Sequence, residues 1–284
     1  MIDLHTHTDE SDGTLTAFQL VDAAVALGLE ALGITDHDTL AGYNTAAPRA
    51  REAGLDLVCG IELSTRRRAR AAGIRGRSIH LLGYFLREAP AEGFREWLEG
   101  IRLARRDRNE RLAARLRSLG MDIAIEEVKR LGRSQAGRPH FARLMVEKGY
   151  VANIQEAFDL YLDEEARAYV ERDEPELETG IRMIAGAGGL ASLAHPVRSS
   201  RRNPPAFEKD VGEMREMGLA AIEAYHSDHR PADTEFFLAL ARRHGLAVTG
   251  GSDFHGDNKP GLALGTGYGN VAVPREVLDK LRRL

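Results

Sequence analysis

The sequence predicts an α/β protein, and two regularities carry this prediction. Short apolar runs alternate along the chain with longer segments of helical periodicity, and several of these segments end in glycine just before the next apolar run. Short apolar runs bounded by such turn signals are typical of buried strands. Strands that alternate with helices predict a mainly parallel sheet, either closed into a barrel or open and doubly wound.

Seven apolar runs are the expected strands, and we predict that they run parallel. They cover residues 2–6, 31–35, 57–61, 79–85, 190–194, 220–224 and 246–250. Amphipathic helical patterns fall between several of them, at residues 17–27, 180–187, 211–217 and 234–244. The repeated order of strand and helix is that of a β/α fold.

Residues 93–167 interrupt this alternation. Their helical patterns lie at 94–119, 125–131, 140–148 and 154–160. The first of these patterns is long and rich in arginine, and the segment holds no strand candidate. We therefore predict an all-helical insertion between the fourth and fifth strands, which divides the β/α part into residues 1–92 and 168–284.

Composition excludes several classes of protein. With 43% hydrophobic and 29% charged residues over 284 positions, the chain is an ordinary globular one. It has no run of ~18 apolar residues and no basic and then apolar leader, so we expect a cytoplasmic protein that makes no membrane contact. The single cysteine, Cys59, lies in an apolar run and is expected to be a buried hydrophobe. The run 66–77 holds six arginines and no acid, and the sequence assigns it no role.

Histidines and carboxylates gather at the expected strands, mostly at their carboxyl ends. They are His5, His7, His37, Glu62, His80, His195, Asp253 and His255. An isolated His-x-His pair is more often structural, but here six of the ten histidines converge on one face. Alternate residues of a strand share a face, so His5 and His7 can bind one ion. Imidazole with carboxylate suits zinc, manganese or iron, and the number of ligands predicts a multinuclear centre.

The segments around these residues carry motifs of a known family. They are MIDLHTHTDESDGTLT, LGITDHDTLAG, GIELS, IHLLGY, AHPVR and GGSDFH. Together they resemble the PHP (polymerase and histidinol phosphatase) family of metal-dependent phosphoesterases, whose fold is a distorted, TIM-like barrel of seven strands. The segments GRPHFARLMVEKG and EAYHSDH are most similar to a bacterial subgroup. That subgroup removes the 3′-phosphate from nucleoside 3′,5′-bisphosphates and includes a related 5′ to 3′ exoribonuclease.

The resemblance implies a trinuclear centre of two or three occupied sites. Its ligands would be His5, His7, Glu62 and Asp253 for the first ion, Glu62, His80 and His195 for the second, and Asp12, His37 and His255 for the third. Glu62 and Asp253 would be the catalytic carboxylates, because they hold a hydroxide that bridges the first two ions and attacks phosphorus. We expect Asp36 and Asp38 to orient metal-bound imidazoles. Manganese is the expected metal, with iron and zinc as alternatives.

The insertion is expected to act as a lid that recognises a second phosphate. The candidate contacts are Arg138, His140 and Arg143 near the start of an expected helix, and Arg198 and His229 nearer the metals. The expected substrate is a small nucleotide, a nucleoside 3′,5′-bisphosphate, and we expect no recognition of DNA sequence. The basic helix leaves open the trimming of short RNA 5′ ends, although its low aromatic content argues against stacking a long strand.

Three other functions share parts of this plan. A histidinol-phosphate phosphatase would use the same metals, but such relatives generally lack the arginine-rich insertion. A metal-dependent amidohydrolase would be expected to carry a carboxylated lysine, and no lysine occupies an expected strand end. A non-catalytic binding module would have lost ligands, whereas all nine expected ligands are present.

Overall fold

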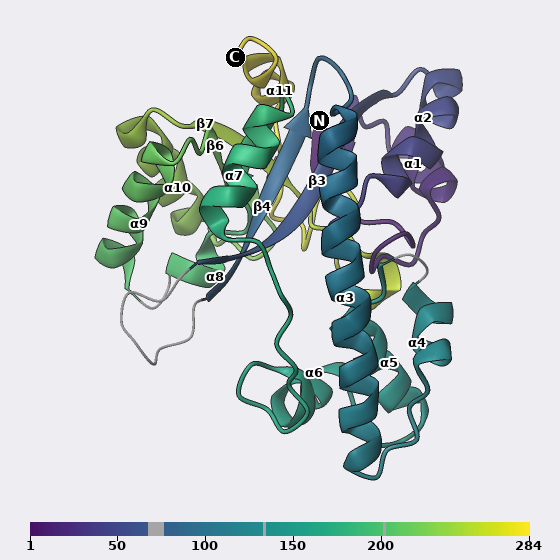
Figure 1. The fold of residues 1–284 in the computed structure, drawn as a ribbon. Coiled ribbons are helices and arrows are strands. Elements are labelled where there is room, and N and C mark those ends of the chain that lie inside the picture. The colour runs from purple at the N-terminus through teal and green to yellow at the C-terminus, as the bar shows by residue number, and fades with distance from the viewer. Residues whose placement is uncertain (68–76, 133–134, 201–202) are drawn as a thin grey trace.

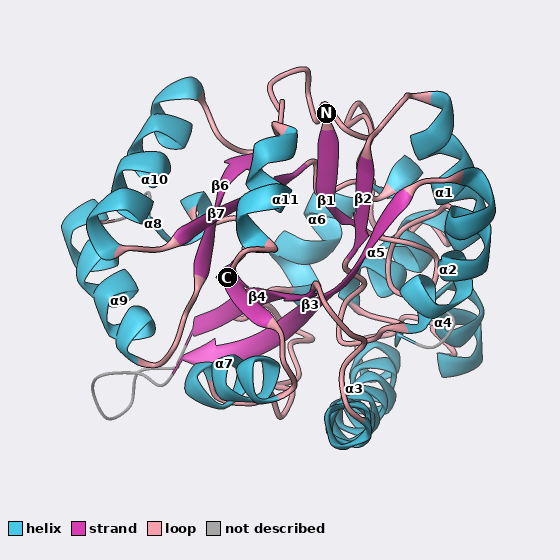
Figure 2. Ribbon diagram, turned by 90° about the horizontal axis from the view of Figure 1, so that it is seen from above, coloured by secondary structure: helices cyan, strands magenta, loops and turns pink. Residues whose placement is uncertain are grey.

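Seven strands form one sheet in the computed structural model, which describes residues 1–67, 77–132, 135–200 and 203–284. The strands are β1 Ile2–Thr6, β2 Ala31–Ile34, β3 Asp56–Arg67, β4 Arg77–Phe85, β5 Leu190–Leu193, β6 Ala221–His226 and β7 Ala247–Gly251. Their order in the sheet is their order in the chain. The sheet comes close to closing where the end of β1 and the segment after β7 exchange backbone hydrogen bonds of 2.9 Å, from His7 N–H to Phe254 O and from Asp253 N–H to His5 O. The predicted seven-stranded barrel is therefore confirmed (Figure 2).

The prediction that all strands run parallel is wrong for β4. This strand pairs antiparallel with both β3 and β5, whereas the other neighbouring pairs are parallel. β3 and β4 form a hairpin in which Ser64 lies opposite His80, and a hairpin needs no helical crossover. The reversal brings His80, near the start of β4, to the barrel end where the parallel strands have their carboxyl ends. The hairpin connection holds most of the arginine run, and residues 68–76 lie outside the described part of the chain.

Helices flank the sheet and close one end of it (Figures 1 and 2). They are α1 Ala17–Ala26, α2 Ala41–Ala53, α7 Leu177–Gly186, α8 Val197–Ser200, α9 Pro204–Glu216, α10 Pro231–His244 and α11 Arg275–Leu281. Local signals explain their ends: Thr16 and Gln19 form a capping box before α1, and Gly54 ends α2 with a φ of 68°. None of the helices in the described ranges has the length and apolar character that a membrane span requires.

Between β4 and β5 the chain forms a separate group of helices. They are α3 Glu92–Ser118, α4 Ile125–Gly132, α5 Arg138–Glu147 and α6 Ile154–Ala157, with a π-helical turn over Phe158–Leu162. The 27 residues of α3 span about 40 Å and run from the barrel into this group (Figure 1). The group has its own apolar cluster, which includes Leu112, Phe141 and Met145. The helical patterns of the sequence match these elements, and the domain boundaries at 93 and 167 stay a prediction.

Candidate metal centre

Nine side chains with metal-binding atoms meet at the barrel end that faces the insertion. They are His5, His7, Asp12, His37, Glu62, His80, His195, Asp253 and His255. They belong to β1, β3 and β4 or to the segments that follow β1, β2, β5 and β7. Seven of them are buried, and His37 and His80 are partly exposed. Strand ends of α/β barrels build sites in this way because they bring distant parts of the chain to one place.

Glu62 lies at the centre of the group. Its Oε1 is 2.7 Å from His80 Nδ1 and 2.8 Å from His195 Nε2. Its Oε2 is 3.1 Å from His7 Nε2 and 3.3 Å from His5 Nε2. Oε2 is also 3.4 Å from His37 Nδ1. The two oxygens of this carboxylate therefore face different sets of imidazoles, which is the arrangement of a carboxylate that can bridge two ions.

Asp12 organises a second group of donors beside the first. Its Oδ1 is 3.3 Å from His255 Nε2 and 3.5 Å from His7 Nδ1, and its Oδ2 is 3.6 Å from His37 Nε2. One donor atom from each of these four side chains lies within 4.8 Å of the others. The group has the size and the mixture of nitrogen and oxygen donors of a further divalent-metal site.

The donor atoms fit a divalent-metal centre on two counts. The ring nitrogens His7 Nε2 and His37 Nδ1 are buried and make no hydrogen bond, although Glu62 Oε2 lies 3.1 and 3.4 Å from them. A buried polar atom without a hydrogen bond is costly, and a cation bound between these atoms would relieve that cost. Burial would raise the pKa of Asp12, Glu62 and Asp253, but interactions with the surrounding imidazoles, and with Lys259 in the case of Asp253, lower each pKa well below its usual value. The three carboxylates therefore remain anionic and can offset the charge of bound metal ions.

Backbone strain is concentrated at this end of the barrel. Among the described residues, the only non-glycine residues with positive φ are Asp38 at 55°, His195 at 29° and Asp253 at 57°. Such conformations cost free energy and persist only where surrounding contacts enforce them, which is typical of functional sites. Each of the three residues lies a short distance after the carboxyl end of a strand.

Two buried residues of β6 also belong to the site, although the sequence analysis did not select them. Glu223 accepts a hydrogen bond of 2.8 Å from His5 Nδ1 and one of 2.6 Å from the backbone N–H of His195. His226 Nε2 lies 3.3 Å from Asp253 Oδ2. A carboxylate on the second nitrogen of a metal-binding imidazole fixes the ring's orientation and tautomer. The available signal was an acidic residue inside an apolar predicted strand, since a buried charge requires a partner.

Replacing Glu223 with glutamine is expected to lower the affinity for divalent metal by about 10- to 100-fold. The amide keeps the shape of the side chain but weakens the hydrogen bond that orients His5. Titration calorimetry of Mn²⁺ into chelator-treated protein measures this change. Glu216→Gln, at the exposed end of α9, is the matched control and should bind metal as the unmodified protein does. Equal affinities in both variants would contradict the orienting role.

Asp36 does not contact an imidazole directly, which differs from its predicted role. It accepts hydrogen bonds from the backbone N–H and the hydroxyl of Thr8, at 2.8 and 2.7 Å, and from Ser11 Oγ at 2.6 Å. These contacts hold the loop that carries Asp12. Asp36 therefore acts on the metal-binding side chains through the backbone of that loop, with Ser11 Oγ reaching His7 Nδ1 at 3.4 Å.

Asp38 also differs from its predicted role, because it anchors the insertion. It accepts a 2.7 Å hydrogen bond from the backbone N–H of Ser64 and a 2.8 Å one from Arg172 Nη1, and it pairs closely with Arg105 Nη2. Burial would raise the pKa of Asp38, but the two guanidiniums hold it well below its usual value. Arg105 lies on α3, and Arg172 lies on the segment that returns from the insertion to the barrel. Because Asp38 also binds Ser64 of β3, this one carboxylate connects both arginines to the barrel.

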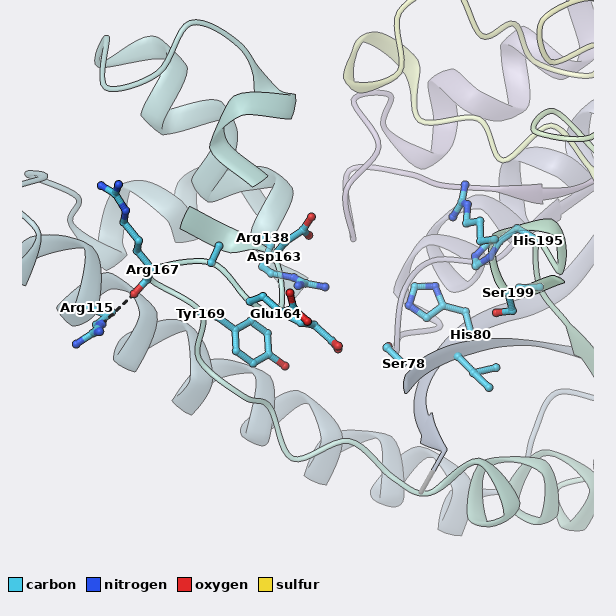
Figure 3. A pocket seen from close by; sticks show the side chains of 15 residues that line it. Ser78, His80, Arg115, Arg138, Asp163, Glu164, Arg167, Tyr169, His195 and Ser199 are labelled. Atoms are coloured by element: carbon cyan, nitrogen blue, oxygen red, sulfur yellow. Dashed lines mark hydrogen bonds between the residues drawn. The ribbon is translucent and has the colours of Figure 1, made fainter. Parts of the chain in front are cut away.

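A cavity of about 950 Å³ adjoins the metal-binding side chains (Figure 3). His80 and His195 lie on its barrel side, and Arg138 lies on the insertion side. Arg198 lines it as well, and its Nη2 is 2.9 Å from Asp253 Oδ2. Two of the five predicted substrate contacts therefore face the cavity.

The other three predicted substrate contacts do not line this cavity. His140 Nδ1 accepts a 3.0 Å hydrogen bond from the backbone N–H just before α5, so the ring occupies the helix terminus that was expected to receive an anion. Arg143 lies on the exposed face of α5 and pairs with Glu147 at 2.8 Å. His229 is buried, and its Nδ1 donates to a backbone carbonyl of β6 at 2.9 Å. The orientation of α5, which sequence alone does not fix, turns the Arg143 side chain to solvent, while hydrogen bonds to the backbone hold the two rings.

Comparison with known proteins finds relatives that are similar in sequence and in fold. A model of the PHP domain matches residues 3–171. A 5′-3′ exoribonuclease of Haemophilus influenzae is 30% identical over 89% of this chain and 89% of its own. A 3′,5′-nucleoside bisphosphate phosphatase of Chromobacterium violaceum is 32% identical over 93% of this chain and 90% of its own. A solved structure from Bifidobacterium adolescentis, described as a candidate metal-dependent phosphoesterase, has a TM-score of 0.82 and 31% identity, covering 98% and 94%.

The barrel, its clustered histidines and carboxylates, and these relatives define a metal-dependent phosphoesterase. The chain belongs to the PHP family, as the match to more than half of its length and the relatives above 30% identity establish. The resemblance found in the sequence motifs is thereby confirmed. The relatives differ in their named substrates, so family membership assigns the reaction class and leaves the substrate to be argued from the site.

Proposed function

We propose that the protein hydrolyses the 3′-phosphate of nucleoside 3′,5′-bisphosphates, for example adenosine 3′,5′-bisphosphate to AMP and phosphate. The observation that carries this proposal is the pairing of the metal-binding side chains with arginines across one cavity. One side of the cavity can act on a phosphate ester, and the other offers Arg138 to a second phosphate. The relative from Chromobacterium violaceum is named for this activity.

The proposed ligand sets are those that the resemblance implies, with Glu62 and Asp253 as the catalytic carboxylates. Divalent ions, manganese first and iron or zinc as alternatives, would supply an activated water and neutralise charge on the phosphate oxygens. Arg198, next to Asp253, is placed to donate hydrogen bonds to a phosphate at the metals. Glu223 keeps the His5 ring in the orientation that binding requires. The insertion, proposed as residues 93–167, would cover the bound nucleotide.

A 5′-3′ exoribonuclease is the second candidate function. The lining of the cavity extends from His195 at the barrel to Arg115 near the end of α3 (Figure 3). The cavity therefore reaches well beyond the metal-binding side chains. Additional arginines along this path could contact the backbone of a short RNA beyond its first nucleotide. Three relatives with 30 to 34% identity are named for this activity, so both candidates require a direct assay.

Substrate comparison tests the proposal. The manganese-loaded protein is incubated with adenosine 3′,5′-bisphosphate, AMP, histidinol phosphate and a 5′-phosphorylated oligoribonucleotide, and the release of phosphate and nucleotide is followed. Release of AMP and phosphate from the bisphosphate, with AMP itself spared, is the expected result. Stepwise release of mononucleotides from the oligomer alone would replace the proposal by the exoribonuclease function. Faster hydrolysis of histidinol phosphate than of the bisphosphate would contradict both.

Replacing Arg138 with alanine is expected to raise the KM for adenosine 3′,5′-bisphosphate by about 10- to 100-fold, with little change for adenosine 3′-monophosphate. The guanidinium would contact only the phosphate that does not react. Arg143→Ala is the matched control, because Arg143 lies on the same helix but pairs with Glu147 outside the cavity. Steady-state kinetics with both substrates measures the effect. An equal loss on both substrates would rule out the role assigned to Arg138.

A further inference from the structure

Asp3 of β1 is a buried carboxylate that lies outside the groups of metal-binding side chains described above. It is fully buried, and no cationic side chain in the described ranges pairs with it. A buried charge without a counter-charge is costly, and it persists only where hydrogen bonds replace those lost to water. The hydrogen bonds of Asp3 therefore show which parts of the chain this carboxylate holds together.

Each oxygen of Asp3 accepts two hydrogen bonds. Oδ1 accepts from the backbone N–H of Ser252 at 2.9 Å and from that of His5 at 3.3 Å. Oδ2 accepts from Ser252 Oγ at 2.5 Å and from the backbone N–H of Gly265 at 2.8 Å. An ionised carboxylate has about four acceptor positions, so an amide or a hydroxyl at this position could not receive the same set of donors.

These hydrogen bonds cross the junction between β1 and β7, which are the two end strands of the sheet order. The other neighbouring strands are joined by ladders, whereas in the described part of the chain β1 meets the segment directly after β7 in one isolated bridge, Thr6 with Phe254. The two backbones approach closely here, since a Cβ on Gly251 would lie 2.3 Å from the backbone nitrogen of His5. The side chain of Asp3 therefore supplies part of the connection that backbone pairing supplies elsewhere in the sheet.

Metal-binding atoms on the two sides of this junction face one another. Asp253 Oδ1, on the β7 side, lies 3.4 Å from His5 Nε2 and 3.5 Å from His7 Nε2 on the β1 side. Ser252, which Asp3 binds twice, directly precedes Asp253. A shift of this segment against β1 would therefore separate atoms that are proposed to bind the first ion.

Another group of metal-binding side chains lies away from the junction and allows an internal comparison. Glu62 and His80 belong to β3 and β4, and His195 follows β5. His80 Nδ1 and His195 Nε2 lie 2.7 and 2.8 Å from Glu62 Oε1. Asp3 makes its hydrogen bonds to β1 and to the segments after β7, and none of them reaches these three side chains. Loss of the Asp3 carboxylate should therefore affect the two parts of the metal centre unequally.

We infer that Asp3 is a positioning residue, which fixes His5 and His7 on β1 relative to Asp253 and His255 after β7 and thereby sets the metal affinity of the sites that span the junction. This inference rests on the ligand sets given under the proposed function and is independent of the substrate named there. The sequence analysis did not select Asp3. The available signal was a carboxylate in an apolar strand, on the same face of that strand as His5.

Zinc binding followed by NMR tests this inference ring by ring. Chelator-treated protein with isotope-labelled histidine is taken through a buffered series of free Zn²⁺ concentrations, and the ring-nitrogen shifts give a binding midpoint for each imidazole. In Asp3→Asn, one acceptor becomes a donor that faces other donors. The midpoints of the junction rings should rise about 10-fold or more, and those of the comparison group should stay within about 2-fold. The junction rings are His5, His7 and His255, and the comparison group is His80 and His195. Equal rises for all five rings, or no rise for any, would overturn the inference.

Two further variants keep the test decisive if Asp3→Asn folds poorly. Ser252→Ala removes only the hydroxyl donor to Asp3, so it should raise the midpoints of the same junction rings by about 2- to 10-fold. Asp56→Asn is the matched control, because Asp56 pairs with Arg275 and Arg282 outside the metal centre. It should leave every midpoint unchanged. If neither Asp3→Asn nor Ser252→Ala shifts the junction rings selectively, the inference is wrong.

Kinetics give a second readout that separates metal positioning from substrate binding. In Asp3→Asn, the Mn²⁺ concentration for half-maximal hydrolysis of adenosine 3′,5′-bisphosphate should rise about 10-fold or more, while the KM for the bisphosphate at saturating Mn²⁺ should stay within about 2-fold. A raised KM with an unchanged Mn²⁺ dependence would contradict the inference. A selective shift of the zinc midpoints in a protein that is inactive on the bisphosphate would contradict only the proposed function.

Discussion

Glu62→Gln is expected to abolish phosphoesterase activity, with a loss of about 1,000-fold or more in kcat/KM. Both oxygens of Glu62 face imidazoles, Oε1 at 2.7 to 2.8 Å and Oε2 at 3.1 to 3.4 Å. The amide of glutamine replaces one acceptor with a donor, which repels a cation and cannot bridge two ions. Metal content by mass spectrometry should fall together with activity, because the same oxygen atoms serve both.

Glu165→Gln is the matched control for this variant. The control variant makes the same replacement of a carboxylate by an amide. Glu165 is exposed and lines the cavity of about 950 Å³, but it is not among the metal-binding groups. It should retain metal content and most activity. If Glu62→Gln kept both the metal content and the rate of the unmodified protein, the bridging arrangement would be wrong.

Asp38→Asn is expected to destabilise the fold by about 3–5 kcal/mol. Asp38 is 1% exposed and receives two buried guanidiniums, so its replacement leaves Arg105 and Arg172 without their shared carboxylate. Denaturant unfolding followed by circular dichroism measures the change. Asp107→Asn, on the exposed face of α3, removes only a surface pair with Arg111 and should change stability by less than about 0.5 kcal/mol. Equal stabilities of the two variants would contradict the anchoring role.

The pH dependence of stability gives an independent check on Asp38. Its pKa is lowered below the ordinary 3.8, so the folded state holds this carboxylate anionic where the unfolded state begins to bind a proton. The stabilisation of the folded state by the Asp38 carboxylate is fully present above the pKa of the unfolded state. It is lost as the pH falls below 3.8 toward the pKa of the folded state. The difference in unfolding free energy between the unmodified protein and Asp38→Asn should therefore shrink as the pH falls below about 4. A difference that grows on acidification would contradict this account.

Much of the site was predictable because its residues carry local signals. His5 and His7 alternate at the end of an apolar run, and Asp253 and His255 repeat the spacing at the end of another. In a β/α fold the carboxyl ends of parallel strands meet at one end of the barrel, so residues far apart in sequence could be assigned to one place. The motif resemblance added Asp12, which its own surroundings identify only as a turn residue.

Other parts of the site depend on partners that no local pattern encodes. Glu223 lies in an element that the sequence located well, but its importance comes from what surrounds it. Glu223 matters because His5, distant in sequence, turns a ring nitrogen toward it. The orientation of α5 likewise decided that Arg138 faces the cavity while Arg143 faces solvent.

The sequence by itself located the seven strands, the helices between β4 and β5 and most of the side chains that gather at the candidate metal centre, because hydrophobic periodicity and strand-end chemistry are local properties. Only the tertiary structure decided the direction of β4, the anchoring of α3 by Asp38 and which arginines line the cavity beside the metal-binding side chains. These features are set by the packing of segments that are distant in the chain. Burial and charge pairing act through space, and they become visible only when the fold brings the partners together.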